Sequence, residues 1–180
     1  QIQIDRRKKW VEDWEKHLLE EASKDAKSKR KMHPLQLGVD IISEMNDDDG
    51  LVFDGGNTHF WNEIAVNISG WRGKKLGGIM HPGNYSLLGV GISFGVSAKA
   101  AHPEKNVVVI SGDGAFLSGG LSVESAFQEG LPIVVVIDNN GGLDCISQQQ
   151  ERLFSNGKHY ATDFRDIPFH TMFEGLGGYG

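Results

Sequence analysis

The sequence predicts an α/β fold with a mostly parallel central sheet and helices on both faces. Two β-branched apolar runs, at residues 107–110 and 133–137, have the length and composition of buried parallel strands. The stretch between them has room for one crossover helix, so the carboxyl ends of both strands are expected at one edge of the sheet. Asp113 and Asn140 follow these runs, and open α/β sheets bind ligands at this edge.

Helical patterns fill the first part of the chain. Residues 5–31 are rich in charge and carry Trp10, Trp14 and Leu18 at intervals of four, which indicates a surface helix that lies on another element. Pro34 suits the first turn of a second helix. Since the chain opens with Gln rather than Met, we expect residues 1–33 to be a linker helix from a preceding domain.

The rest of the chain, residues 34–180, is expected to be one domain that is truncated at its C-terminus. Helices and strands alternate along it, as a layered α/β sheet requires. The expected strands cover residues 51–53, 107–110 and 133–137. The expected helices cover residues 34–45, a segment around residues 60–66, and residues 87–101, 121–129, 144–153 and 167–173. Residues 70–86 are expected to form a glycine-rich loop.

Composition excludes several classes of protein. Hydrophobic residues make up 39% and charged residues 23%, with a formal net charge of -6, which is typical of a globular protein and argues against nucleic-acid binding. No apolar run approaches the roughly 20 residues that cross a bilayer, so we expect no membrane contact and a cytoplasmic location. The single cysteine, Cys145, excludes an internal disulfide framework and fits a reducing compartment.

One motif, made of two polar turns at a fixed spacing, is the main indication of function. Gly112-Asp113-Gly114 is followed, after 24 residues, by Asn139-Asn140-Gly141-Gly142. Taken alone, Asp113 could be a helix cap and the Asn pair an ordinary turn. Those explanations do not account for two polar turns at neighbouring strand ends with this spacing, which resembles the signature of thiamine diphosphate-dependent enzymes.

The resemblance implies a Mg²⁺ site and a cradle for thiamine diphosphate. The Asp113 carboxylate, the Asn140 side-chain oxygen and the Gly142 carbonyl correspond to the family's metal ligands. Mg²⁺ prefers six oxygen ligands, so three protein oxygens leave room for diphosphate oxygens and water. Gly112 belongs to the same cofactor-binding turn, and the N–H groups of Gly114 and Ala115 are expected to face the diphosphate.

Two further segments are similar to cofactor contacts of this family. Asn57 and Thr58 correspond to a second diphosphate contact, although a plain helix N-cap explains them equally well. The carbonyl of Ser86 corresponds to the acceptor of the aminopyrimidine amine. Leu88 corresponds to the side chain that holds the cofactor bent, which makes it a catalytic residue through cofactor conformation; ordinary helix packing is its alternative.

Other candidates are weaker on the sequence alone. The run at residues 89–95 mimics a dinucleotide-binding fingerprint, but no β-branched strand precedes it and no βαβ unit frames it. A lone loop histidine is more often exposed or hydrogen-bonded than functional. Of His59 and His81, the second is the better candidate, because its loop is expected to border the cofactor.

Within the family, the resemblance covers residues 34–180 and points to the acetolactate synthase and decarboxylase group. The runs at residues 55–58, 115–124 and 139–142 look most like oxalyl-CoA decarboxylase and 2-hydroxyacyl-CoA lyase, so a C–C lyase or carboligase is expected. An acetolactate synthase-like 2-keto acid enzyme is the alternative, and Asp144 departs from the acyl-CoA group, where an aromatic residue is common. A non-catalytic assembly or regulatory module with the same fold is the third possibility.

The resemblance also implies a partner. In these enzymes, a Glu on a separate pyrimidine-binding domain protonates the cofactor, and that domain comes from the same or another subunit of a homodimer or homotetramer. No segment here resembles it. Glu124 and Glu129 are expected to lie on the crossover helix, where they are simply helix formers. We therefore expect the chain to be catalytically inert alone.

Overall fold

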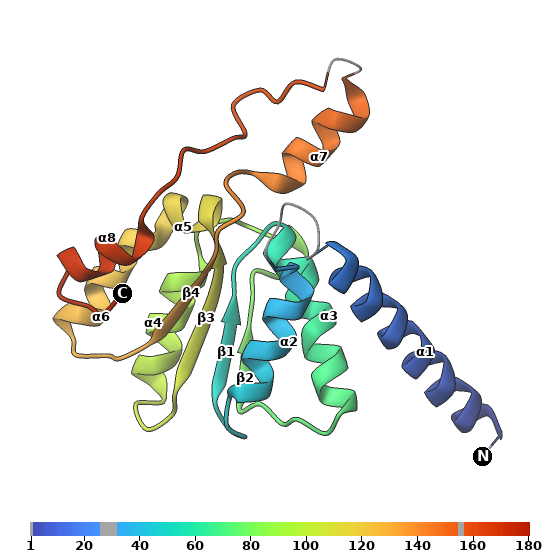
Figure 1. The fold of residues 1–180 in the computed structure, drawn as a ribbon. Coiled ribbons are helices and arrows are strands. Elements are labelled where there is room, and N and C mark those ends of the chain that lie inside the picture. Colours follow the sequence, from blue (N-terminus) through green and yellow to red (C-terminus); the bar gives the residue numbers. More distant parts are fainter. Residues whose placement is uncertain (1, 26–31, 155–156) are drawn as a thin grey trace. The chain divides into compact units, whose positions relative to one another are not determined.

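A computed structural model describes residues 2–25, 32–154 and 157–180 (Figure 1). It confirms the α/β class, with a sheet of parallel strands in the order β2-β1-β3-β4 that is flanked by helices. The strands are β1 (Gly50–Phe53), β2 (Gly78–Met80), β3 (Val107–Gly112) and β4 (Val134–Asp138). All three pairings between neighbouring strands are parallel.

The described residues form two compact units: one within residues 1–45 and 61–74, the other within residues 46–60 and 75–180. The second unit contains the sheet. Its helices are α4 (Gly91–Ala101), α5 (Asp113–Gly119), α6 (Glu124–Gln128), α7 (Asp144–Leu153) and α8 (Phe169–Gly175), with short 3₁₀ helices η1 (Gly83–Tyr85) and η2 (Gly120–Val123). The start of α3 (Asn57–Trp71) also belongs to this unit.

The core of the sheet unit forms around β3, whose first five residues are all buried. Helix α4 packs on this strand through small residues, and Gly95 lies so close to Val109 that a methyl group there would overlap the valine side chain. Phe116 of α5 packs edge-on against Phe169 of α8, with ring centroids 5.5 Å apart. Apolar burial of this kind is the main stabilising contribution to the fold.

The other unit contains α1 (Ile2–Asp25), α2 (Pro34–Glu44) and most of α3. As the tryptophan stripe predicts, α1 packs against another element: Trp14 meets Trp71 of α3 with ring centroids 6.2 Å apart. The end of the helix expected at residues 5–31 lies outside the described residues, which resume at residue 32. The proposed boundary between a linker and a domain at residue 33 stays a prediction.

The structure corrects three of the expected boundaries. Helix α4 begins at Gly91 rather than residue 87, because Gly89 has a positive φ of 86° that a right-handed helix does not accept. The expected loop at residues 70–86 contains β2 and η1. The crossover between β3 and β4 is α5, η2 and α6 rather than one helix, and α5 starts directly at Asp113.

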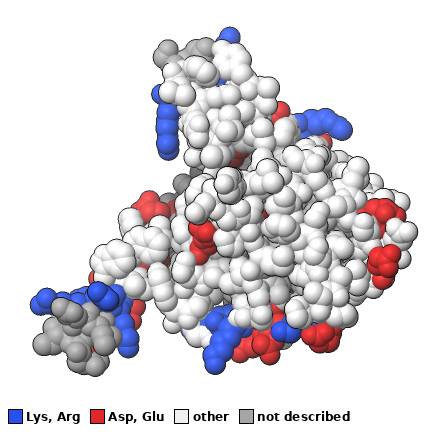
Figure 2. All heavy atoms as spheres, turned by 180° about the vertical axis from the view of Figure 1, so that it is seen from behind, with Lys and Arg blue, Asp and Glu red and all other residues white. Residues whose placement is uncertain are grey.

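Figure 2 shows one face of the molecule, on which charged side chains lie in small separate groups and most of the surface is uncharged. The basic side chains visible there do not form a continuous strip among the described residues. The expectation that the chain binds no nucleic acid stays a prediction. Within the part of the chain that the structure describes, no helix combines the length and the apolar character needed to cross a membrane.

Candidate cofactor site

The two polar turns predicted from the sequence follow neighbouring strands. β3 and β4 are paired in parallel, with Gly112 opposite Asp138 at the end of the ladder. Asp113 comes directly after β3, and Asn140 lies two residues beyond β4. The expectation that both residues lie beyond the carboxyl ends of adjacent strands is therefore confirmed.

The carboxylate of Asp113 is held by backbone donors from both turns. Its Oδ1 accepts from the N–H of Gly114 at 2.7 Å. Its Oδ2 accepts from Gly141 N at 2.8 Å and from Gly142 N at 2.9 Å. The side chain is only 2% exposed, so these bonds fix its orientation and fasten the turn after β4 to the start of α5.

This buried carboxylate has the electrostatic character of a cation ligand. Burial raises the pKa of Asp113, and the negative charge of Asp144 adds to the rise, while the hydrogen bonds from Gly114, Gly141 and Gly142 oppose it. No ion pair joins Asp113 to a Lys, Arg or His among the described residues. Buried charges are normally paired or bound to a metal, so a divalent cation fits this site.

The turn that carries Gly142 is packed against the segment after α7. A Cβ atom at Gly142 would overlap the carbonyl of Thr162, so only glycine allows this approach. Leu143 N donates to Thr162 O at 2.8 Å, and Phe164 N donates to Gly141 O at 2.8 Å. The Gly142 carbonyl accepts from Asp144 N at 3.0 Å, and its second lone pair is the one left for a cation.

The start of α3 brings polar side chains to the same edge. Asn57 is the first residue of this helix, and its Nδ2 donates to Asp144 Oδ2 at 3.0 Å. Thr58 is 3% exposed, and its Oγ1 lies 3.5 Å from Asp138 Oδ2. The helix N-terminus therefore faces the turns after β3 and β4, where its dipole favours an anion.

The loop before α4 forms another wall. Gly55 lets the carbonyls of Ser86 and Leu87 approach its backbone, where any Cβ would overlap them. Leu88 is 38% exposed and precedes α4, which begins at Gly91. Its side chain is therefore not packed in a helix core, so ordinary helix packing, the alternative role for Leu88, does not apply.

These walls enclose a cavity of about 300 Å³. All ten predicted cofactor-binding residues line it: Asn57, Thr58, Ser86, Leu88, Gly112, Asp113, Gly114, Ala115, Asn140 and Gly142. The first residues of three helices, α3, α5 and α7, are also among its lining. Helix N-termini carry partial positive charge, so the cavity combines an acidic cation site with three dipoles that attract an anion.

A larger cavity of about 980 Å³ lies beside β4 and α8. Its walls are mainly apolar, including Phe127, Ile133, Phe169 and Phe173, and none of the ten predicted residues lines it. Because convergent polar groups mark a site of chemistry more reliably than size does, we assign the chemistry to the smaller cavity.

Sequence reasoning gave Asp54 and Asp144 no role in the site and ranked His59 below His81, yet all three polar residues shape the site. Asp54 is fully buried and accepts hydrogen bonds from Gly55, Gly89, Gly91 and Ser111. Asp144 lines the cavity. His59 bonds Ser86 and His81. Asp54 did carry a signal, because an Asp directly after a buried strand is costly unless it has partners.

Several known proteins are similar to this chain in sequence. Residues 54–180 match the family model of the thiamine pyrophosphate enzyme, C-terminal TPP binding domain. The human 2-hydroxyacyl-CoA lyase 2 is 27% identical over 180 residues, which cover 95% of this chain and 27% of that protein. The catabolic acetolactate synthase of Raoultella terrigena is 25% identical over 149 residues, which cover 83% of this chain and 25% of that protein.

A solved structure is also similar. It is the thiamine diphosphate-dependent 4-hydroxybenzoylformate decarboxylase of Rhodococcus jostii RHA1, with a TM-score of 0.66 and 27% identity over 81% of this chain and 26% of that one. The chain thus spans about a quarter of the length of these relatives. The family match covers well over half of the chain and includes every residue that lines the smaller cavity. The chain therefore belongs to the thiamine pyrophosphate enzymes and contains their C-terminal cofactor-binding domain.

Proposed function

We propose that the smaller cavity binds the diphosphate of thiamine diphosphate through Mg²⁺, with Asp113, Asn140 and the Gly142 carbonyl as protein ligands. The observation that carries this proposal is the buried Asp113 carboxylate in a cavity lined by three helix N-termini. A divalent cation would neutralise the carboxylate, and the helix ends would attract the diphosphate.

The roles of the other lining residues follow from their positions. Asn57 and Thr58 lie at the start of α3, where they would hydrogen-bond the terminal phosphate. Gly114 N already donates to Asp113, so Ala115 is the better of the two backbone donors on α5. Ser86 would offer its carbonyl to the aminopyrimidine, and Leu88 would support the bent cofactor. When bound, the cofactor supplies the electron sink for cleavage or formation of a C–C bond.

For the whole protein, we propose a C–C lyase or carboligase of the 2-hydroxyacyl-CoA lyase or oxalyl-CoA decarboxylase type. It would work in the cytoplasm as a homodimer or homotetramer, with a pyrimidine-binding domain from the same or another subunit. The similarity to human 2-hydroxyacyl-CoA lyase 2 across 95% of the chain supports this choice.

An acetolactate synthase-like 2-keto acid enzyme is the second candidate. It is favoured by Asp144, which lines the cavity at a position where the acyl-CoA group commonly has an aromatic residue. The similarity to the catabolic acetolactate synthase of Raoultella terrigena also supports it. Assayed with a pyrimidine-binding partner, the first candidate predicts turnover of oxalyl-CoA or a 2-hydroxyacyl-CoA, and the second predicts turnover of pyruvate.

A non-catalytic module with the same fold is the alternative of a different class. Asp113 and Asn140 at the positions of the family's metal ligands argue against it, because a module without a cofactor has no need for both residues at one cavity. If the paired, folded protein neither binds thiamine diphosphate nor turns over any 2-keto acid or 2-hydroxyacyl-CoA, the non-catalytic alternative replaces both enzymatic candidates.

Calorimetric titration with thiamine diphosphate, with and without Mg²⁺, tests the binding proposal on this chain. We expect binding only with Mg²⁺, and an affinity about 100-fold lower for Asp113→Ala, because a metal ligand is lost. The matched control is Asp49→Ala. Asp49 is another buried carboxylate of the sheet unit that accepts from Asn46 and Asn106 away from the cavity. Equal affinities for both variants would overturn the proposal.

A further inference from the structure

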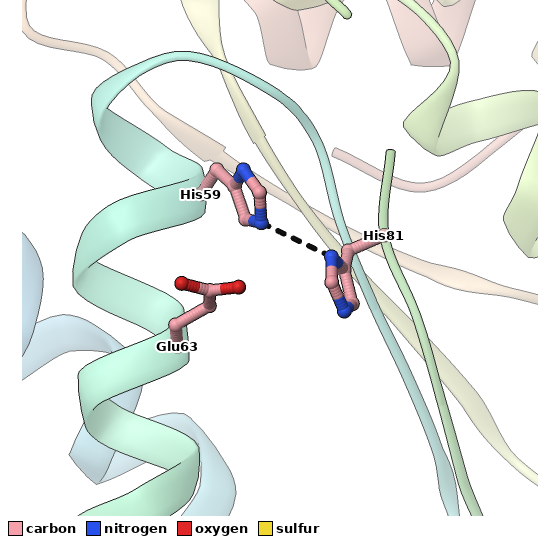
Figure 3. A group of neighbouring side chains, drawn as sticks. All are labelled: His59, Glu63 and His81. Carbon is pink, nitrogen blue, oxygen red and sulfur yellow. Dashed lines mark hydrogen bonds between the residues drawn. The ribbon is translucent and has the colours of Figure 1, made fainter. Parts of the chain in front are cut away.

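Two imidazoles connect the wall of the cavity to the loop after β2. Gly56 N donates to Ser86 Oγ at 2.9 Å, and Ser86 Oγ lies 3.3 Å from His59 Nδ1. His59 Nε2 lies 3.0 Å from His81 Nδ1, the contact drawn in Figure 3. His81 Nδ1 is also 3.2 Å from the N–H of Gly83. These four contacts form one continuous chain of hydrogen bonds.

The positions of the protons in this chain of hydrogen bonds follow from its backbone N–H groups, which can donate a hydrogen bond but cannot accept one. The N–H of Gly83 can only donate, so His81 Nδ1 must carry a lone pair. His59 must then donate to it from Nε2, and a neutral His59 is left with an acceptor at Nδ1. The hydroxyl of Ser86 therefore donates to His59 and accepts from Gly56. Nε2 is thus assigned as a protonated nitrogen in both rings.

Aromatic packing holds the two rings in place. His59 is only 4% exposed and lies 5.6 Å from the ring of Phe53 and 5.8 Å from that of Phe60. His81 stacks on Phe53 with a centroid distance of 4.9 Å and an interplanar angle of 7°. Because Phe53 ends β1 and is itself buried, the pair has little freedom to rotate away from Ser86.

Ser86 needs such support. Its φ of 46° lies in the left-handed region, which a residue with a Cβ adopts at a cost unless its surroundings hold it there. The hydroxyl is fixed on one side by Gly56 and on the other by His59. The same residue turns the chain so that its carbonyl faces Gly55 and Leu88 reaches the cavity.

We propose that His59 and His81 are positioning residues for the cofactor site. Acting through Ser86, the pair holds the Ser86 carbonyl and the Leu88 side chain where they meet the aminopyrimidine half of the cofactor. This inference rests on the proposed function, since the position of the loop affects binding only if the cavity takes thiamine diphosphate. Neither histidine touches the cofactor in this role.

A pair of variants at His81 separates positioning from packing. Asn places an oxygen close to the position of Nδ1, so His81→Asn keeps an acceptor for both donors, whereas His81→Leu fills the space without one. We expect His81→Leu to weaken Mg²⁺-dependent binding of thiamine diphosphate about tenfold, and His81→Asn to stay within about twofold of the wild type. Equal affinities for the two variants would overturn the proposal.

Nitrogen NMR of the histidine side chains gives a second test that needs no cofactor. We expect His59 and His81 to carry their proton on Nε2, and Ser86→Ala to shift the Nδ1 resonance of His59. A proton on Nδ1 of His81 would overturn the hydrogen-bond chain even if both variants bind normally. If the tautomers are as assigned and the wild type does not bind thiamine diphosphate, the proposed function fails while the hydrogen-bond chain stands.

Discussion

The carboxylate of Asp54 accepts a hydrogen bond from the backbone N–H of Gly89 at 2.9 Å, across 35 residues of sequence. The same side chain also accepts from Gly55 N, Gly91 N and the hydroxyl of Ser111. It is fully buried. One carboxylate thus fastens the ends of β1 and β3 to the loop that carries Ser86 and Leu88.

We predict that Asp54→Ala lowers the free energy of unfolding by roughly 3 kcal/mol or more, because four buried donors lose their acceptor. Asp54→Asn keeps one acceptor oxygen and should cost about half as much. Urea unfolding of both variants measures the difference. Should Asp54→Ala unfold at the wild-type midpoint, the loop would be held by other contacts.

Gly55→Ala is predicted to impair the site through backbone overlap. The new Cβ would overlap the carbonyls of Ser86 and Leu87, so the loop must move away from the cavity. Gly175→Ala is the control, since a Cβ there meets nothing within 4 Å. We expect weaker thiamine diphosphate binding, by about tenfold or more, for Gly55→Ala alone. Unchanged binding by that variant would show that the loop position is not needed.

The raised pKa of Asp113 makes stability depend on pH. Because burial raises the pKa, the native chain keeps this proton to higher pH than the unfolded chain does. The free energy of unfolding contributed by this group is therefore highest below its unfolded pKa of about 3.9 and falls as pH rises through the raised native pKa.

Mg²⁺ should reverse this trend, since the ion needs the charged carboxylate. Thermal unfolding with and without Mg²⁺ and thiamine diphosphate should give curves that diverge as pH rises through the native pKa. Asp113→Asn should show neither the slope from this group nor the divergence. Parallel wild-type curves across that range would contradict the assignment of Asp113 as a ligand.

His159 is predicted to stabilise the segment after α7, and its contribution to stability should also fall as pH rises. Its Nδ1 lies 2.8 Å from Asp163 Oδ1 and its Nε2 lies 2.9 Å from Glu151 Oε1. These hydrogen bonds, that to Asp163 first, raise the pKa of the imidazole. The stabilisation is thus full below the unfolded pKa of about 6.5 and is lost as pH rises through the raised value.

His159 joins α7 to the segment that supports the Gly142 turn, because Gly142 forms an isolated bridge with Asp163. Hydrogen exchange of the Leu143 and Phe164 amides should therefore show greater protection below the native pKa of His159 than above it. In His159→Gln the change in protection should vanish. An unchanged pH profile in that variant would remove His159 from the support of the turn.

Much of the sheet could be predicted because its strands carry a local signal. Residues 107–110 and 133–137 are β-branched runs, and β3 and β4 form there in parallel. β2 was missed because Gly78, Ile79 and Met80 are only three residues, all exposed, with no alternating pattern. It forms because neighbouring β1 offers a partner edge, a cause that lies outside the segment itself.

The residues of the site also differ in how far the sequence predicts them. Asp113 and Asn140 could be predicted because each follows its own strand, and family resemblance supplied Ser86 and Leu88. The partners of Asp54 and His59 could not be predicted, because they lie 35 and 22 residues away at Gly89 and His81. Such pairs are set by the folded loops, and no local pattern specifies them.

The position of the metal ion is the central claim, and paramagnetic relaxation tests it most directly. With Mn²⁺ in place of Mg²⁺ and thiamine diphosphate present, we expect selective broadening of the Gly114, Gly141 and Gly142 amides, which surround the Asp113 carboxylate. The broadening should disappear in Asp113→Ala. Strong broadening elsewhere with these three amides unaffected, or unchanged broadening in the variant, would contradict the account.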